Sequence, residues 1–215
     1  MSIIDIASIR KDYKLKSLSE DDVLQNAVLQ FDIWFKEALA AEVAEPNAMV
    51  LSTVGERGKP SSRVVLIKEY DQTGFTFFTN YHSQKGTDML LNPSACLNFF
   101  WPQLERQIRI EGIVEKVSEQ ESIEYFNSRP WESRVGAWVS NQSSEVSNRK
   151  TLEDLFEELN AKFKREGNIP KPSYWGGYLL KPSFIEFWQG RPSRLHDRIC
   201  YEYENNNWRI FRLAP

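Results

Sequence analysis

The chain contains few of the residues that bind metals or form disulfides. Its 215 residues include two cysteines, Cys96 and Cys200, and two histidines, His82 and His196. The cysteines lie far apart and form no Cys-x-x-Cys motif, so we interpret them as small buried residues in a reducing compartment. With so few metal ligands, no zinc or other transition-metal site is expected.

Long apolar runs and glycine-rich nucleotide loops are also missing. No stretch approaches the roughly 20 apolar residues of a membrane span, and the segment up to Lys16 resembles neither a signal peptide nor an anchor. We therefore expect a cytoplasmic protein. Without a Gly-x-Gly-x-x-Gly turn or a Walker lysine loop, a nucleotide-like cofactor would have to be held by side chains. The net charge of −3 disfavours general binding to nucleic acids or membranes.

Aromatic residues, in contrast, are abundant. Hydrophobic residues make up 41% of the chain and aromatic residues 13%, which indicates a folded globular protein with one substantial core. The aromatic side chains exceed what such a core needs. Some of them are therefore expected to line a binding site or an interface.

The order of the predicted elements indicates a mainly β fold with peripheral helices (α+β). Strands or β-rich segments are expected over 48–54, 62–70, 75–79, 95–101, 106–117, 175–180, 184–189, 198–203 and 208–213. Helices are expected from Ser19 to about Pro46, over 83–91, from a capping box at Ser118 and Glu121, and from Thr151 to Gly167. Consecutive strands joined by tight turns favour an antiparallel barrel over a parallel sheet.

A short segment near the C-terminus, Arg194-Leu195-His196-Asp197-Arg198, combines cations with a histidine. Arginine can bind a phosphate through two hydrogen bonds and stack on a flat ring, and histidine changes protonation near neutral pH. The segment therefore suits a planar, anionic ligand. Taken alone, it would more often be a strand end whose charges are solvated.

Arg63 and Lys68 lie five residues apart at the two ends of one predicted strand. Side chains alternate faces along a strand, so these two would point to opposite faces unless a bulge intervenes. Two cations on opposite faces could serve two different phosphates. By themselves, however, both are more simply read as solvent-exposed charges.

Three further groups of residues suit phosphate or a heterocycle. The predicted helix start at Ser83, with Lys85, offers backbone N–H groups and a cation. Tyr125, Arg129 and Ser133 are spaced by four and would supply donors for a phosphate monoester, although an arginine at a helix end is also favoured by the helix dipole. The side chains of Gln107, Gln142 and Ser143 suit the mixed donor and acceptor edge of a heterocycle.

Ten motifs, in order and with normal spacing from about residue 10 to the end, resemble the pyridoxine (pyridoxamine) 5′-phosphate oxidase family. They are Arg63–Lys68, Phe78–Asn80, Leu104–Gln107, Ser128–Pro130, Gly136–Ser140, Gln142–Ser144, Trp175–Gly177, Phe187–Gly190, Arg194–Arg198 and Arg212–Pro215. The resemblance implies a homodimer of split β-barrels with FMN bound non-covalently at the subunit interface. It implies a mobile N-terminal arm (1–18), an FMN-binding split-barrel domain (19–169) and a C-terminal dimerisation and active-site region packed on the barrel (170–215).

The resemblance also implies roles for individual residues. The cofactor-binding residues would be Arg63, Val64, Val65, Leu66, Ile67, Lys68, Phe78, Thr79, Gln84, Lys85, Gln107, Gln142, Ser143, Trp188 and Arg198. The substrate-binding residues would be Arg10, Tyr13, Lys68, Tyr125, Arg129, Ser133, Arg194 and His196, the last two also being the catalytic residues. Two positions depart from the family pattern, because Gln84 replaces a common arginine and Glu45 a usual aspartate.

The reaction implied is the FMN-dependent oxidation of pyridoxine 5′-phosphate and pyridoxamine 5′-phosphate to pyridoxal 5′-phosphate in vitamin B6 metabolism. Dioxygen would be the acceptor, giving hydrogen peroxide, and the amine would also release ammonia. One alternative is an enzyme of the same fold that reduces another substrate. A second is a non-catalytic carrier of flavin or pyridoxal phosphate.

Overall fold

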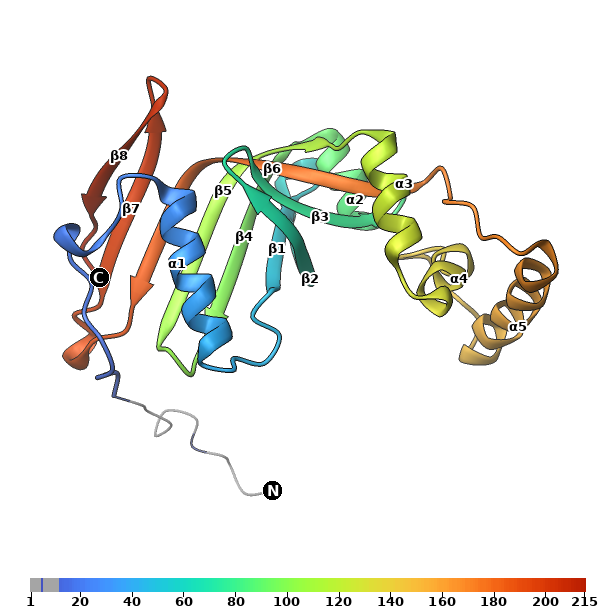
Figure 1. Ribbon diagram of the computed structural model, residues 1–215, viewed down its shortest axis with the longest axis horizontal. Helices are drawn as coiled ribbons and strands as arrows, with labels where there is room; N and C mark the ends of the chain where they lie inside the picture. The colour runs from blue at the N-terminus through green and yellow to red at the C-terminus, as the bar shows by residue number, and fades with distance from the viewer. Residues whose placement is uncertain (1–4, 6–11) are drawn as a thin grey trace. The chain divides into compact units, whose positions relative to one another are not determined.

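The computed structural model describes Asp5 and residues 12–215, and its strands form one antiparallel barrel with two further strands (Figure 1). The strand order is β3-β2-β1-β4-β5-β6-β7-β8, and pairing of β3 with β6 closes the first six strands. The strands are β1 (Ala48–Val54), β2 (Pro60–Asp71), β3 (Gly74–Asn80), β4 (Ser94–Trp101), β5 (Arg106–Lys116), β6 (Trp175–Gln189), β7 (Asp197–Glu204) and β8 (Asn207–Arg212). The predicted fold class, mainly β with peripheral helices, is confirmed.

Short local motifs begin and end the helices. Ser118 and Glu121 form the predicted capping box of α3, and α5 ends at Gly167, whose φ of 70° is the left-handed conformation that glycine adopts readily. Pro130 separates α3 from α4, as its missing N–H requires. The helices are α1 (Ala27–Ala40), α2 (Gln84–Leu91), α3 (Glu119–Ser128), α4 (Trp131–Val139) and α5 (Arg149–Glu166). Within residues 12–215, none of the helices has the length and apolar character needed to cross a membrane.

The predicted starts of two helices are wrong. Ser19 does form a capping box, but with Asp22 around a single 3₁₀ turn, Glu20–Asp22. Helix α1 begins later, because the side-chain oxygen of Asn26 accepts hydrogen bonds from the backbone N–H groups that follow it. Helix α5 likewise begins before Thr151, since Asn148 caps it at a distance of 3.0 Å from the Thr151 N–H.

The two β segments predicted over 175–180 and 184–189 are one strand, β6. Its first part, Trp175–Leu180, pairs with β3, and its last part, Phe184–Gln189, pairs with β7. Pro182 lies between these two ladders, so its missing N–H removes a hydrogen bond from neither of them. A proline therefore does not end this strand.

The chain divides into two compact units. Unit 1 comprises the chain up to Pro46 with Leu97–Ile110 and Ser183–Pro215, and unit 2 comprises Asn47–Cys96 and Glu111–Pro182. The three-part division predicted from the sequence stays a prediction.

Aromatic packing forms the core of unit 1. Phe31 and Trp34 on α1 contact Phe99 and Phe187, with ring centroids 5.3 and 5.1 Å apart. The predicted C-terminal hairpin is present, and the positive φ of Asn205 in its turn is one that asparagine tolerates well.

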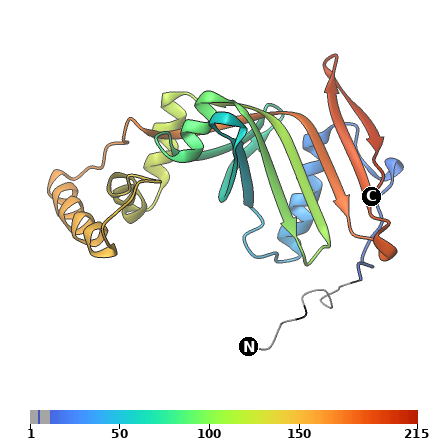
Figure 2. The ribbon, with the colours of Figure 1, turned by 180° about the vertical axis from the view of Figure 1, so that it is seen from behind.

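In unit 2, helices α3, α4 and α5 share a small core with the start of β6. Figures 1 and 2 show α4 and α5 side by side. The core residues are Phe126, Val135, Phe163, Ile169 and Trp175. This packing fixes the ends of α3 and α4 that carry the predicted phosphate-binding residues.

Candidate functional site

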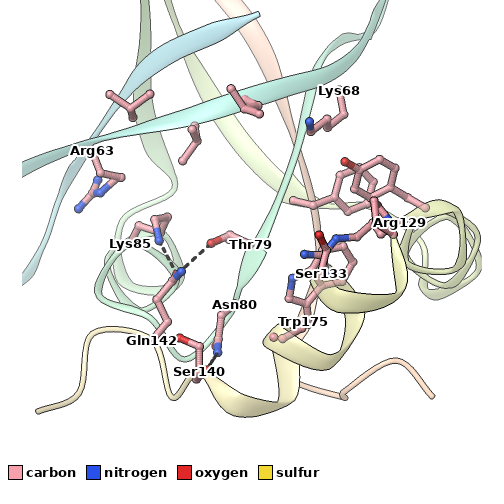
Figure 3. Close-up of a pocket in the computed structure, with 18 residues that line it drawn as sticks. Arg63, Lys68, Thr79, Asn80, Lys85, Arg129, Ser133, Ser140, Gln142 and Trp175 are labelled. Carbon is pink, nitrogen blue, oxygen red and sulfur yellow. Dashed lines mark hydrogen bonds between the residues drawn. The ribbon is translucent and has the colours of Figure 1, made fainter. Parts of the chain in front are cut away.

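Unit 2 contains a cavity of about 800 Å³, formed by β2, β3, the helices α2 to α4 and the start of β6 (Figure 3). The volume is typical of small-molecule sites. The lining residues are Arg63, Val64, Val65, Leu66, Lys68, Phe78, Thr79, Asn80, Lys85, Tyr125, Arg129, Pro130, Ser133, Gly136, Ala137, Ser140, Gln142 and Trp175. This set includes four cationic side chains and, among the described residues, no acidic one.

Arg63 and Lys68 line this same cavity although they are five residues apart on β2. The pairing of β2 with β3 shifts register between Ile67 and Glu69, so the strand bulges at Lys68 and redirects its side chain. Figure 3 shows Arg63 and Lys85 at one end of the cavity, and Lys68 and Arg129 at the other. The bulge thus converts two opposed positions into two cationic ends of one site.

Lys85 is a buried cation held by neutral oxygens. Its side chain is 7% exposed, and its Nζ donates to Gln142 Oε1 at 2.6 Å and to Ser83 Oγ at 3.3 Å. Burial and the nearby charge of Arg63 lower the pKa of Lys85 to about 8. Because no carboxylate in residues 12–215 pairs with Lys85, this end of the cavity favours an anion.

The segment after α4 is tied to this end of the cavity by side-chain hydrogen bonds. Gln142 Oε1 also accepts from the Thr79 hydroxyl at 3.4 Å, and Asn80 donates to the Ser140 carbonyl at 3.4 Å (Figure 3). Ser143 accepts a hydrogen bond from the Gln84 backbone N–H at 3.1 Å. Polar groups suited to a heterocycle edge are therefore fixed beside the cations.

The other end of the cavity combines stacked aromatic rings with an unsatisfied arginine. Phe78 stacks on Tyr125 with centroids 3.9 Å apart, and the Arg129 guanidinium lies 4.7 Å from the ring centroid of Trp175. Arg129 Nη1 is buried and has no hydrogen-bond partner in the described chain, and burial lowers the pKa of Arg129. An unpaired buried donor of this kind costs roughly 1–3 kcal/mol, so a ligand oxygen would stabilise it.

Six residues predicted to bind the cofactor are absent from the cavity lining, and three of them, Ile67, Gln84 and Ser143, belong to unit 2. Ile67 is buried in the core, and the Ser143 hydroxyl accepts a hydrogen bond from the backbone N–H of Gln84 at the start of α2. The Gln84 amide donates to Asp88 Oδ1 at 2.7 Å. The lining also includes residues that received no role from the sequence: Asn80, Pro130, Gly136, Ala137, Ser140 and Trp175. Trp175 and Asn80 stand in motifs noted above, but the sequence does not show where their side chains point.

The remaining predicted residues in the described chain belong to unit 1: Tyr13, Gln107, Trp188, Arg194, His196 and Arg198. Trp188 and His196 have ring centroids 4.6 Å apart, and Tyr13 packs edge-on against both at 5.6 and 5.9 Å. Arg10 lies outside the described residues.

The protonation of His196 is set by its neighbours. The Arg191 backbone N–H donates to His196 Nδ1 at 3.1 Å, so the neutral ring carries its proton on Nε2. Burial and the charge of Arg194 lower the pKa of His196, although Asp197 opposes them. At neutral pH the ring is therefore a neutral hydrogen-bond donor through Nε2.

Arg194 is distinguished by its backbone conformation, and Arg198 by the hydrogen bonds of its side chain. Arg194 has a φ of 61°, a sparsely populated conformation that occurs often at functional sites. Arg198 donates through Nε and Nη2 to the buried carboxylate of Glu186, at 2.6 and 3.1 Å. Its Nη1 donates to the Ala214 carbonyl at 2.8 Å.

Two family models match the chain. One is described as pyridoxamine 5′-phosphate oxidase and covers residues 35–163, and the other is described as the pyridoxine 5′-phosphate oxidase C-terminal dimerisation region and covers residues 175–215. The pyridoxine/pyridoxamine 5′-phosphate oxidase of Cyanothece sp. is 52% identical over 212 residues, or 99% of each chain. The protein of that name from Cupriavidus metallidurans is 56% identical over 211 residues, covering 98% of this chain and 99% of the relative.

Solved structures agree with these matches. PhzG from Burkholderia lata, in complex with tetrahydrophenazine-1-carboxylic acid, superimposes with a TM-score of 0.87 at 30% identity, covering 94% of this chain and 99% of that one. A pyridoxamine 5′-phosphate oxidase-related, FMN-binding protein from Nostoc punctiforme shares the fold, with a TM-score of 0.68 at 16% identity over 93% and 100% of the two chains. The predicted split barrel is therefore confirmed, and the chain belongs to the pyridoxine/pyridoxamine 5′-phosphate oxidase family.

Proposed function

We propose that this protein is an FMN-dependent oxidase that converts pyridoxine 5′-phosphate and pyridoxamine 5′-phosphate to pyridoxal 5′-phosphate. The observation that carries the proposal is a cavity with two cationic ends, Arg63 with Lys85 and Lys68 with Arg129, and no acidic residue in its described lining. Two phosphorylated ligands, cofactor and substrate, require two such ends. The names of the curated relatives support the same activity.

The end formed by Arg63 and Lys85 fits the phosphate of FMN. A lysine whose pKa burial lowers to about 8, held by neutral oxygens, gains an opposite charge when a phosphate binds. Gln142 and Thr79 would contact the isoalloxazine edge. When bound, FMN would accept a hydride from the exocyclic carbon of the substrate, and dioxygen would reoxidise the flavin to give hydrogen peroxide.

The end formed by Lys68 and Arg129 fits the substrate phosphate. Arg129 would direct its unsatisfied Nη1 to a phosphate oxygen, and the hydroxyls of Tyr125 and Ser133 would add donors. The contact of Arg129 with Trp175 orients the guanidinium before the ligand arrives. Substrate binding would thus require little rearrangement.

Residues of unit 1 would act on the substrate ring. Arg194 would stack on the face of the ring, and His196 would donate a hydrogen bond through Nε2. Tyr13, which packs against Trp188 and His196, would contact the substrate from the N-terminal side. Holding the ring in one orientation brings its reacting carbon to the cofactor and supplies proximity.

We also propose that FMN sites are built from both chains of a homodimer. One family match covers a C-terminal dimerisation region. Val50 and Val64 face each other across β1 and β2 and are 36% and 68% exposed, and Val64 also lines the cavity. Exposed apolar residues beside a cationic cavity are expected where a second copy covers them. A monomer that retains stoichiometric FMN in light-scattering measurements would contradict this arrangement.

The activity is tested by absorbance of the FMN-reconstituted protein without oxygen. Addition of pyridoxamine 5′-phosphate should bleach the flavin bands, and readmission of oxygen should restore them with formation of hydrogen peroxide. Unchanged bands in a protein that binds FMN would instead indicate a carrier or an enzyme for another substrate. If the protein does not bind FMN, then FMN is not its cofactor.

A further inference from the structure

Asp88 lies on α2, one turn after Gln84, and none of the roles described above involves it. Its side chain is 2% exposed and does not line the cavity. Its Oδ2 lies 3.9 Å from Arg63 Nη2. Among the described residues, no other carboxylate forms an ion pair with a cation of the cavity lining.

Three side chains donate hydrogen bonds to Asp88. Its Oδ2 accepts from the hydroxyls of Thr53 and Ser61, at 2.7 and 2.9 Å. Its Oδ1 accepts from the Gln84 amide at 2.7 Å. Burial would raise the pKa of Asp88, but these hydrogen bonds and the charge of Arg63 lower it overall. Asp88 is therefore an ionised, acceptor-only group at neutral pH.

The same two hydroxyls accept hydrogen bonds from Arg63. Nη1 of Arg63 donates to Thr53 Oγ1 at 2.8 Å, and Nη2 donates to Ser61 Oγ at 2.6 Å. A hydroxyl has one hydrogen, and both Thr53 and Ser61 give theirs to Asp88, so their lone pairs point to the guanidinium. Nη1 also donates to the carbonyls of Leu51 and Ser61 at 3.2 and 3.1 Å. Nε of Arg63 makes no hydrogen bond within the described chain, so it stays available to a ligand.

We propose that Asp88 is a positioning residue for phosphate binding. It orients the hydroxyls of Thr53 and Ser61, which hold the Arg63 guanidinium so that its Nε edge is presented to the phosphate of FMN. The inference rests on the proposed function, because it takes that phosphate as the anion bound at Arg63.

The two possible roles of Asp88, positioning Arg63 and neutralising its charge, predict opposite changes in phosphate affinity when the carboxylate is removed. If Asp88 acted only through its charge, removing that charge would make the cavity more positive and tighten phosphate binding. If it positions Arg63, its loss lets the two hydroxyls turn their hydrogens toward the guanidinium, and phosphate binding weakens. The sign of the change therefore distinguishes the two roles.

The test compares Asp88→Asn with wild type in the affinity of the cofactor-free protein for FMN and for riboflavin, which lacks the phosphate. Flavin fluorescence gives both dissociation constants at one ionic strength. We expect Asp88→Asn to weaken FMN binding by about tenfold, the size of one lost charge-assisted hydrogen bond. Riboflavin binding should be unchanged, which a general structural role would not allow.

Two further variants complete the test. Thr53→Val keeps the carboxylate and the side-chain shape but removes one hydroxyl, and it should show the same selective loss for FMN. Asp71→Asn is the matched control, since Asp71 accepts from Thr73 N–H in the turn after β2 at 2.7 Å and does not line the cavity. It should change neither affinity.

Tighter FMN binding by Asp88→Asn, or an equal loss for FMN and riboflavin, would overturn the inference. If Asp88→Asn does not fold, normal FMN affinity in Thr53→Val would overturn it. A wild-type protein that binds neither flavin would instead overturn the proposed function, and with it the anion assumed here.

Discussion

The Nζ of Lys85 and the Oε1 of Gln142 lie 2.6 Å apart at the end of the cavity that also holds Arg63. The amide oxygen holds the ammonium group in place without cancelling its charge, as a carboxylate would. The positive charge is therefore available to a ligand, and it is also easily lost, because burial and Arg63 lower the pKa of Lys85 to about 8.

Affinity for FMN should therefore fall as the pH rises through about 8. Above that value Lys85 loses its proton in the unliganded protein, while the phosphate, with a second pKa of about 6, stays a dianion. The dissociation constant, measured from about pH 7 to about pH 9.5, should rise by up to about tenfold per pH unit above the break. Lys85→Gln should bind FMN more weakly, and its dissociation constant should not begin to rise near pH 8. If the dissociation constant of Lys85→Gln still rises above pH 8, another group causes the pH dependence.

The stability of the ligand-free protein should change with pH in the opposite direction. The folded-state pKa of Lys85 is depressed from 10.5 to about 8, so between these values the unfolded chain binds more protons than the folded chain. Its contribution to the free energy of unfolding therefore rises with pH across this window. Urea unfolding of wild type and Lys85→Gln at several pH values gives the difference in their free energies of unfolding, which measures this contribution. A difference that does not change with pH would contradict the lowered pKa of Lys85.

Arg63→Ala should mainly weaken the binding of FMN, whereas Lys68→Ala should mainly weaken the binding of the substrate. A charge-assisted hydrogen bond contributes about 1.5–3 kcal/mol, so Arg63→Ala should weaken FMN binding by roughly 10- to 150-fold. Lys68→Ala should mainly raise KM for pyridoxamine 5′-phosphate. Flavin titration and steady-state kinetics of the two variants check this, and an exchange of the two phenotypes would reverse the assignment of the cavity ends.

Arg129→Met should stabilise the ligand-free protein while impairing substrate binding. The buried, unpaired Nη1 costs roughly 1–3 kcal/mol, more than the ~0.5–1 kcal/mol expected from the contact with Trp175. Thermal unfolding should show a higher Tm without ligand and a much smaller gain in Tm on adding substrate. A lower Tm without ligand would show that Nη1 is well satisfied.

Arg194→Lys should slow flavin reduction even when the protein is saturated with substrate. A compact ammonium group can neither stack on the ring nor form two parallel hydrogen bonds. Anaerobic stopped-flow absorbance of the FMN-loaded variant with pyridoxamine 5′-phosphate measures this step. Arg191→Lys is a matched control, because Arg191 pairs with Asp197 at 3.4 Å and holds His196 through its backbone alone. Wild-type reduction in Arg194→Lys would remove the proposed role.

The same experiment on His196→Asn separates two roles of the histidine. If His196 only donates a hydrogen bond through Nε2, asparagine should preserve much of the reduction rate. If it transfers a proton, the rate should fall by the ~10²–10⁴-fold typical of general acid–base catalysis. The neutral ring has one acceptor nitrogen, Nδ1, and it is already occupied by the Arg191 backbone N–H, so we expect the smaller effect at neutral pH.

Local signals in the sequence predicted most of the fold. The capping box of Ser118 and Glu121, the helix end at Gly167 and the Asn205 turn each depend on a few neighbouring residues. The family resemblance added residues of the cavity, among them Arg63 and Arg129, because such residues keep their order along the chain.

Features that depend on distant contacts were not predictable. The Lys68 side chain points into the cavity because of a register shift between β2 and β3, and no local sequence pattern predicts such a shift. In the sequence, Asp88 is an acidic residue within the helix predicted over 83–91, and acidic residues are mostly exposed. It is buried because Thr53 and Ser61, on two other elements, meet it there.

The absence of carboxylates from the described cavity lining also has a kinetic consequence. The chain as a whole carries a net charge of −3, whereas the lining carries four cations. The field of these cations would attract phosphorylated ligands toward the cavity despite the net negative charge of the chain, which would raise the rate of productive encounters. Added salt shortens the range of this field, so ionic strength controls how fast ligands are captured, while the short contacts inside the cavity control how long they stay.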